Sequence, residues 1–203
     1  RDVERKRRRS KPPIDRRLLQ AMNELMEEGE DFANTSIEQL TKKAGISRAT
    51  FYLHFKDKAE LIAYLFEEVE EEIIRSAGQW FIDASQSTQL SFRDNLFNIL
   101  TAYRTHYAVI SAMTQTAMGN ERVRELNRQM VDGFCEATYQ AIAQLRAVDR
   151  ADEEVTDRVG ELITKAVFYV SAFNPETIAE EQIGATCDAW AHIVWHSLVQ
   201  PGK

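Results

Sequence analysis

The sequence predicts an all-α fold in which a small N-terminal helical unit continues into a larger helical C-terminal unit. Apolar residues recur at helical spacing along most of the 203 residues, and only 8 Gly and 4 Pro interrupt them. No stretch alternates polar and apolar residues over the length of a strand. We predict a basic arm at residues 1–13, a three-helix unit at 14–58 and a larger helical unit at 59–203.

Charge is unevenly distributed along the chain. The first 58 residues hold 14 Lys and Arg against 10 Asp and Glu, whereas residues 59–203 hold 11 against 22. The basic block runs through Arg16 and Arg17; it either solvates itself as a tail or acts as an arm on DNA. No apolar run approaches the roughly 20 residues of a membrane span, and the N-terminus is too polar for a signal peptide. We therefore expect a cytoplasmic protein without membrane contact.

The first two helices have recognisable start and stop signals. Apolar residues share one face from Ile14 until Gly29, which predicts a first helix that ends at the glycine. Thr35 followed three places later by Glu38 predicts a capping box for a short second helix. Gly45 ends that helix.

Two more helices follow directly. Ser47 is suited to cap a helix of about two turns, on which Phe51 and Phe55 form the apolar side. Asp57 with Glu60 again combines a cap with an acidic residue and opens a long amphipathic helix. Because this helix continues into the C-terminal unit, we expect no sharp boundary between the two units.

Beyond residue 78 we predict five further helices, separated by weak breaks at 85–91, near 107, at 119–120, at 147–151 and at 174–175. The last two, at about 153–173 and 176–198, present more apolar surface than a terminal hairpin can hide. A two-fold dimer through these two helices would bury it. The residues concerned are Val159, Ile163, Val167, Trp190, Ile193, Val194 and Leu198.

Residues 35–58 have the arrangement of a helix-turn-helix, because two capped short helices flank a Gly-Ile-Ser turn. In such a motif the N-terminal end of the second helix enters the major groove of DNA. Polar side chains suited to that surface are Arg48, Thr50, Tyr52 and His54. The alternative is an ordinary helical hairpin with a polar surface.

Residues 44–58 resemble the tetracycline-repressor (TetR) family in the run Ala-Gly-Ile-Ser-Arg-Ala-Thr-Phe-Tyr-Leu-His-Phe-Lys-Asp-Lys. The resemblance implies a regulator, typically a repressor, that leaves a palindromic operator in double-stranded DNA when a small effector binds. It also implies that Arg48 reads a base, where its guanidinium fork can bridge guanine O6 and N7. Further implied contacts, which position the protein on the phosphates or adjacent bases, are Thr35 or Ser36, Ser47, Thr50, Tyr52, His54 and Lys58.

The resemblance also implies a ligand cavity among the middle helices and a homodimer through the last two. One run resembles the pocket lining of the ethionamide-resistance regulator, a family member with a long apolar tunnel, although the tryptophan-rich lining of that tunnel is mostly absent here. Few charges fall among these positions, which favours an apolar or aromatic effector over an anion. The run comprises Phe92, Leu96, Ile99, Leu100, Tyr103, Met130 and Phe134.

Other chemistry finds little support in the sequence. Without a phosphate-binding loop, a nucleophile elbow or a cofactor motif, we expect neither an enzyme nor a cofactor. His192 and His196, with Asp188 one turn earlier, could present metal ligands on one helical face, but no metal motif accompanies them and we predict no metal site. The alternative function is a helical-bundle lipid carrier or scaffold without specific DNA binding.

Overall fold

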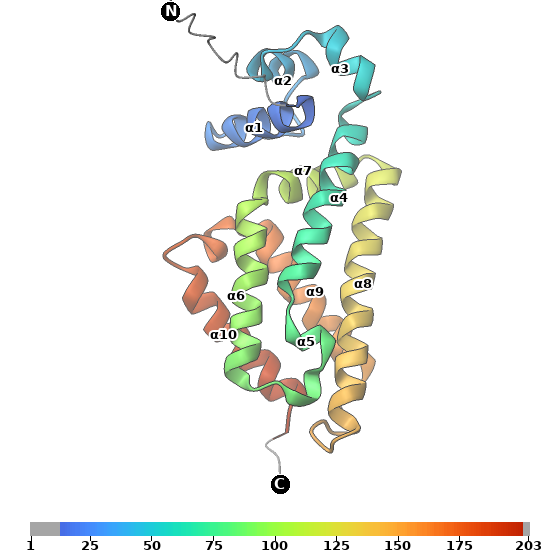
Figure 1. Cartoon of the computed structure of the whole chain (residues 1–203), viewed down its shortest axis with the longest axis vertical. Helices are drawn as coiled ribbons and strands as arrows, with labels where there is room; N and C mark the ends of the chain where they lie inside the picture. Colours follow the sequence, from blue (N-terminus) through green and yellow to red (C-terminus); the bar gives the residue numbers. More distant parts are fainter. Residues whose placement is uncertain (1–12, 201–203) are drawn as a thin grey trace, which may run out of the picture. The chain divides into compact units, whose positions relative to one another are not determined.

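The computed structural model describes residues 13–200, and this part of the chain is helical and contains no strand (Figure 1). The predicted all-α fold is confirmed. The chain divides into two compact units with the boundary between Lys58 and Ala59. The basic arm predicted at 1–13 lies, apart from Pro13, outside the described residues.

Unit 1 contains α1 (Ile14–Glu27), α2 (Ile37–Ala44) and α3 (Arg48–His54). Gly29 and Gly45 follow the ends of α1 and α2 with left-handed backbone angles, φ +84° and +63°, which glycine adopts without steric cost. α2 packs against both α1 and α3. The apolar faces of the three helices and of the connecting turn enclose one small core, made by Leu18, Met22, Phe32, Leu40, Phe51 and Phe55.

The start of α2 differs from the sequence prediction, whereas the start of α3 matches it. The capping box consists of Ser36 and Gln39, because Ser36 Oγ accepts from the Gln39 amide at 3.1 Å and Gln39 Oε1 accepts from the Ser36 amide at 2.8 Å. The predicted pair, Thr35 with Glu38, was therefore wrong by one residue. The predicted cap of α3 is confirmed, since Ser47 Oγ accepts from the backbone amide of Thr50 at 3.0 Å.

Unit 2 contains more helices than the five predicted after residue 78. Six α-helices follow that point in the described chain, because one of them is a single turn, too short to show a helical period in the sequence. The last two begin later than predicted, at Asp157 and Ile183, since turns precede them. The helices are α4 (Lys58–Ser76), α5 (Gln79–Ile82), α6 (Gln89–Thr105), α7 (Tyr107–Ala117), α8 (Glu121–Arg146), α9 (Asp157–Phe173) and α10 (Ile183–Leu198), with 3-10 turns at Ala84–Gln86 and Pro175–Ile178.

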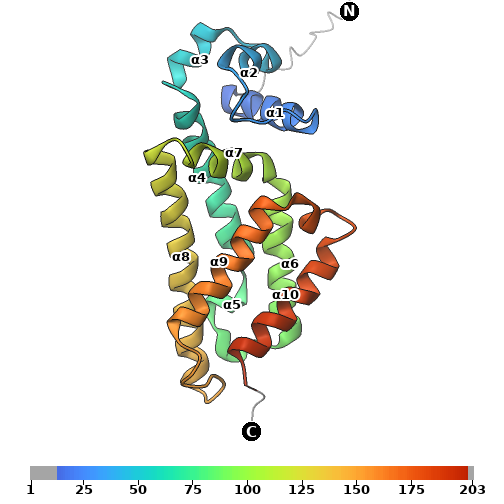
Figure 2. The same cartoon turned by 180° about the vertical axis from the view of Figure 1, so that it is seen from behind.

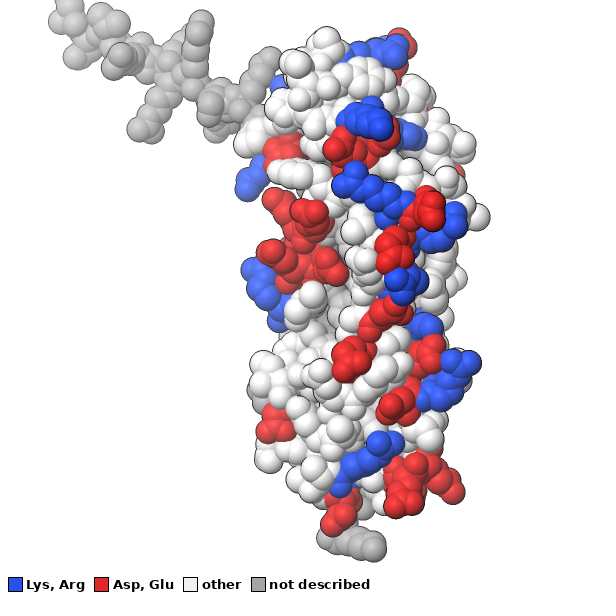
Figure 3. Space-filling view, turned by 90° about the vertical axis from the view of Figure 1, so that its right-hand side faces the viewer, with Lys and Arg blue, Asp and Glu red and all other residues white. Residues whose placement is uncertain are grey.

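The helices of unit 2 form a layered bundle. α10 packs against α6 and α9 against α8, and Figure 2 shows α9 and α10 together on one side of the bundle. On the face that carries α8, acidic and basic side chains are interspersed (Figure 3). On α8 itself, Arg128 pairs with both Glu125 and Asp132. This face therefore does not offer a continuous basic surface. None of the helices between residues 13 and 200 combines the length and hydropathy needed to cross a membrane.

Candidate nucleic-acid interface and ligand pocket

The solvent face of α3 carries the residue that the sequence predicts to read a base. The side chain of Arg48 is 59% exposed, and its Nη1 lies 3.8 Å from Glu38 Oε2. An exposed ion pair of this length contributes little free energy and is screened by salt. The guanidinium can therefore exchange Glu38 for another acceptor. Tyr52, one helical turn further along, is 49% exposed on the same helix.

Leu53 is an exposed residue of α3 that the sequence analysis missed. It is 81% exposed, although it is apolar. The signal was available, because Phe51 and Phe55 define the buried face and Leu53 lies about 200° around the helix from Phe51. An apolar side chain at a DNA-facing position can contact the methyl group of thymine.

The other predicted contacts at α3 lie at its two ends. Ser47 Oγ, besides capping the helix, lies 2.8 Å from Thr50 Oγ1, so these two hydroxyls are hydrogen-bonded to each other at the N-terminal end. His54 is exposed at the C-terminal end. The structure thus brings Ser47, Arg48, Thr50 and Tyr52 together on one short helix.

Lys58 and Thr35 hold a turn of unit 1. The Lys58 ammonium donates to the carbonyl oxygens of Phe32 at 2.8 Å, Ala33 at 3.1 Å and Thr35 at 2.7 Å, which uses all of its N–H groups. Burial lowers the pKa of Lys58, and the nearby Asp31 carboxylate partly opposes this shift. Thr35 is buried, and its hydroxyl donates to the carbonyl oxygen of Asp31 at 3.1 Å.

This arrangement corrects the interpretation of two predicted phosphate contacts. With its donors used by the turn, the side chain of Lys58 has no N–H left to offer a phosphate in this conformation. Thr35 is likewise turned inward, whereas its neighbour Ser36 is exposed. Of the pair named for this position, Ser36 is the one whose side chain is accessible to solvent.

Arg17 has the corresponding role at the other end of α2. Its Nη2 donates to the carbonyl oxygen of Ala44 at 2.7 Å and also to that of Gly45. These carbonyls end the helix, where a positive charge is stabilising. The sequence had placed Arg17 in the basic block. In the structure Arg17 and Lys58 bind the turns after and before α2, and so fix how α2 presents α3.

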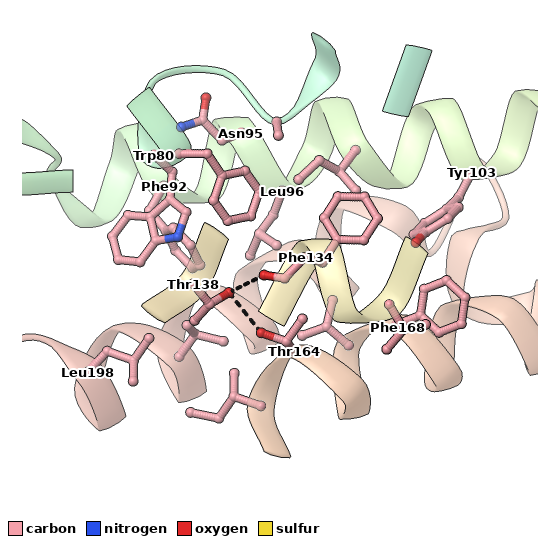
Figure 4. Close-up of a pocket in the computed structure, with 17 residues that line it drawn as sticks. Trp80, Phe92, Asn95, Leu96, Tyr103, Phe134, Thr138, Thr164, Phe168 and Leu198 are labelled. Atoms are coloured by element: carbon pink, nitrogen blue, oxygen red, sulfur yellow. Dashed lines mark hydrogen bonds between the residues drawn. The ribbon is translucent and has the colours of Figure 1, made fainter. Parts of the chain in front are cut away.

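Unit 2 contains a partly open apolar cavity with a volume of about 80 Å³ (Figure 4). Its lining comes from the α4–α5 turn and from α5, α6, α8, α9 and α10. No Asp, Glu, Lys, Arg or His belongs to the described lining. The lining residues are Ala77, Trp80, Phe81, Phe92, Asn95, Leu96, Ile99, Tyr103, Val131, Phe134, Thr138, Ile163, Thr164, Val167, Phe168, Val194 and Leu198.

The structure brings five of the seven predicted ligand-binding residues into this lining, and leaves Leu100 and Met130 outside it. Both are almost fully buried in the core. Each follows or precedes a lining residue directly, and a step of one residue turns a side chain by about 100° away from the cavity. The five residues in the lining are Phe92, Leu96, Ile99, Tyr103 and Phe134.

The apolar surface predicted for dimerisation is distributed differently in the structure. Ile163, Val167, Val194 and Leu198 line the cavity and so face the interior of unit 2. Of the residues predicted for the dimer surface, Ile193 is exposed. Three other apolar side chains, all of α9, are exposed as well, although they were not predicted. The exposed set is Leu162, Tyr169, Phe173 and Ile193.

The histidine pair on α10 has no third potential metal ligand beside it among the described residues. The rings of His192 and His196 are adjacent, with centroids 4.5 Å apart. The Asp188 carboxylate, however, accepts a hydrogen bond from Arg93 Nε at 2.9 Å. No group of three or more potential ligands of the His, Cys, Asp and Glu types gathers anywhere in the described part of the chain.

Comparison with known proteins gives a family match over the helix-turn-helix. Residues 18–65 match the family described as bacterial regulatory proteins, tetR family. The nucleoid occlusion factor SlmA of Aliivibrio fischeri is 30% identical over 125 residues, which cover 60% of this chain and 63% of SlmA. The regulator EthR of Mycolicibacterium smegmatis is 26% identical over 155 residues, or 73% of this chain and 70% of EthR.

Among solved structures, the TetR-family regulator PfmR of Thermus thermophilus is similar over 91% of this chain and all of its own, with a TM-score of 0.71 and 16% sequence identity. Similarity at this identity supports the fold. The chain spans a little under two thirds of the length of SlmA, the first of these relatives. The family match thus covers the helix-turn-helix, residues 18–65, whereas the similarity in fold covers 91% of the chain.

Proposed function

We propose that this chain, which belongs to the tetracycline-repressor family of bacterial regulatory proteins, is a DNA-binding transcriptional regulator and not an enzyme. The observation that carries the proposal is the α2–turn–α3 motif. Its second helix is properly capped, buries Phe51 and exposes Arg48 and Tyr52. A short helix with this division of its faces is suited to the major groove.

The proposed DNA contacts are of two kinds, those that recognise bases and those that position the protein on the DNA backbone. Arg48 reads a guanine through O6 and N7, and Leu53 contacts a thymine methyl group. The remaining accessible residues, of which Thr50 is half-buried, position the motif on phosphates or adjacent bases. Lys58 and Thr35 act indirectly, by holding the turn before α2. The proposed positioning residues are Ser36, Ser47, Thr50, Tyr52 and His54.

We propose that the protein acts as a homodimer through α9 and α10. The apolar side chains that these helices expose, such as Tyr169 and Phe173, would be covered by the same surface of a second copy. A two-fold dimer presents two copies of α3, so it would recognise a palindromic operator.

The proposed effector is a small, mainly apolar molecule that occupies the cavity of unit 2 and releases a repressor from its operator. Ala77, in the turn that follows α4, is part of the lining, and α4 is the helix that begins at Lys58. A ligand that moves this turn can therefore act on α4. Coupling requires only that the ligand bind the two states with different affinity, typically by about 1–3 kcal/mol.

The first test is selection of random duplex DNA by the purified protein at moderate salt. We expect an enriched palindrome, and we expect the Arg48→Ala variant to lose definition at one position of each half-site. Arg16→Ala, which changes an exposed arginine of α1, is the matched control and should leave the enriched sequence unchanged. No enrichment would favour a helical-bundle lipid carrier or scaffold, and an enriched single half-site would contradict the dimer.

A further inference from the structure

One polar atom in the cavity wall has no hydrogen-bond partner. Among the buried side-chain nitrogen and oxygen atoms that stand unpaired in the described chain, Asn95 Nδ2 is the one that belongs to a lining residue. Figure 4 shows the Asn95 carboxamide at the end of the cavity near Trp80 and Phe92. A buried amide without an acceptor costs free energy. A ligand that supplies an acceptor at this point would remove that cost.

The Asn95 side chain packs against the turn after α4. Gly78 in this turn has φ +61°, and a Cβ atom built on it would lie 2.4 Å from Asn95 Oδ1. Glycine leaves this space to the carboxamide and adopts the backbone angle without strain. The backbone of a neighbouring element therefore lies directly against the side chain that carries the unpaired amide.

The hydroxyl groups of the two threonines in the lining both donate hydrogen bonds to other protein atoms. Thr138 Oγ1 donates to the carbonyl oxygen of Phe134 at 3.0 Å. Because a hydroxyl has one proton, the 2.8 Å contact between the two threonine oxygens is a donation from Thr164 to Thr138. Tyr103 follows Asn95 on α6 by a backbone rise of about 12 Å along the helix axis, which places it toward the other end of the cavity. Two donors remain at the Trp80 end, the Asn95 amide and the indole N–H of Trp80 itself. Of these two, Asn95 Nδ2 is the one that is buried without a partner in the described chain.

The remaining lining excludes charge. An ion placed among these apolar side chains would lose its hydration without gaining a partner. The cavity of about 80 Å³ holds several waters or a small ring, since one water needs roughly 10–15 Å³ by this measure.

We propose that the cavity selects an uncharged, mainly apolar ligand that carries one hydrogen-bond acceptor, such as a ketone, ester or amide oxygen, and that Asn95 is the residue that recognises this acceptor. The inference rests on the proposed function, because the cavity is the proposed effector site. Beyond the proposed function, the inference specifies the chemical class of the effector and names Asn95 as the residue that selects it.

Four probes of one planar shape test the inference by calorimetric titration of the full chain: acetophenone, α-methylstyrene, benzoate and benzamidine. Acetophenone has the acceptor, α-methylstyrene replaces its oxygen with a methylene group, and the other two are an anion and a cation. We expect acetophenone to bind about tenfold more tightly than α-methylstyrene, and both ions to bind more weakly still.

The variants Asn95→Leu and Asn95→Ala remove the amide donor without adding another one, the second with a side chain too short to reach Gly78. We expect the tenfold preference for acetophenone to disappear in both, so a folding defect in one leaves the other informative. Asn98→Leu is the matched control, because Asn98 is exposed on the same helix and lies outside the lining; it should keep the preference.

The possible failures are distinguishable. Equal binding of acetophenone and α-methylstyrene by the unchanged protein, a preference that survives both Asn95 variants, or tightest binding of benzoate would overturn the role of Asn95 and leave the cavity as a ligand site. Absence of binding by all four probes to the folded protein would overturn the cavity as the effector site.

Discussion

The two units of this protein differ in how completely their buried polar side chains are paired. In unit 1, Arg17 and Lys58 bind backbone carbonyls on either side of α2. Unit 2 also has such bonds, from Arg150 to the carbonyls of Ser85 and Ser87, but the Asn95 amide in the wall of its apolar cavity is left without a partner. The buried unpaired side-chain atoms of the described chain all belong to unit 2. This is the difference that the proposed roles, DNA reading by unit 1 and ligand binding by unit 2, lead us to expect.

The largest effect should come from the core of unit 1. Phe51 is fully buried, so Phe51→Ala should destabilise unit 1 by about 3–5 kcal/mol and abolish DNA binding. Denaturant unfolding and acetophenone binding would be measured together, and we expect unit 2 to keep its ligand. The adjacent Tyr52→Ala, at an exposed position, should change stability by about 0.5 kcal/mol or less while weakening DNA binding. Loss of ligand binding in Phe51→Ala would show that the units do not fold separately.

A second test concerns the exposed apolar side chains of α9 and α10. Phe173 is 55% exposed and stacks on Tyr169, with ring centroids 6.0 Å apart. Phe173→Glu would bury a charge in the proposed interface and should raise the dimer dissociation constant about a hundredfold, or about 2.8 kcal/mol, by sedimentation analysis. Ile82→Glu alters an even more exposed apolar residue, at 70%, on α5 and should leave the dimer intact. Equal behaviour of the two variants would argue against this interface.

Lys58 offers a test of the internal bonding of unit 1. Lys58→Met keeps an unbranched side chain but removes the ammonium that lies over the Phe32 ring and donates to three carbonyls, and we expect a loss of about 2 kcal/mol. Thermal and denaturant unfolding would measure it. Lys42→Met, at an exposed lysine of α2, should cost about 0.5 kcal/mol or less. If Lys58→Met left stability unchanged and only weakened DNA binding, the lysine would be a phosphate ligand after all.

The smallest expected effect is a pH dependence in unit 2. Burial raises the pKa of the Tyr103 phenol above its ordinary value of 10.0. Above that pH the unfolded chain loses the proton while the folded chain keeps it, so stability should fall as pH rises. Tyr103→Phe should reduce this loss when urea midpoints at pH 9 and pH 10.5 are compared. An unchanged pH dependence would mean that the phenol ionises equally in both states.

Sequence patterns predicted unit 1 well because its signals are local. A cap is a contact over three residues, and the periodicity of one short helix separates Phe51 from Arg48. The same locality explains the error at α2. Thr35 with Glu38 and Ser36 with Gln39 have equal spacing, and the tertiary burial of Thr35 decides between them. Arg17 and Lys58 bind carbonyls more than twenty residues away in the sequence, and the local sequence pattern does not indicate such bonds.

The cavity of unit 2 was less predictable than unit 1, because its walls come from helices far apart in the sequence. Its wall on α6 was predicted through the resemblance to the ethionamide-resistance regulator, and the predicted residues Phe92, Leu96, Ile99 and Tyr103 lie in the lining. The opposite wall could not be predicted, since apolar residues cover more than one face of α9 and α10, and only packing decides which face turns inward. Val194 and Leu198 were accordingly assigned to a dimer surface and lie in the lining instead.

The close approach of Gly78 to Asn95 also limits how this protein can be changed. Anyone who screens variants of the cavity for a new effector will find that position 78 does not vary freely. A larger residue there would press on the Asn95 carboxamide and would also be strained by the φ of +61°. A combinatorial library should therefore keep the glycine codon at 78 and randomise position 95 against it.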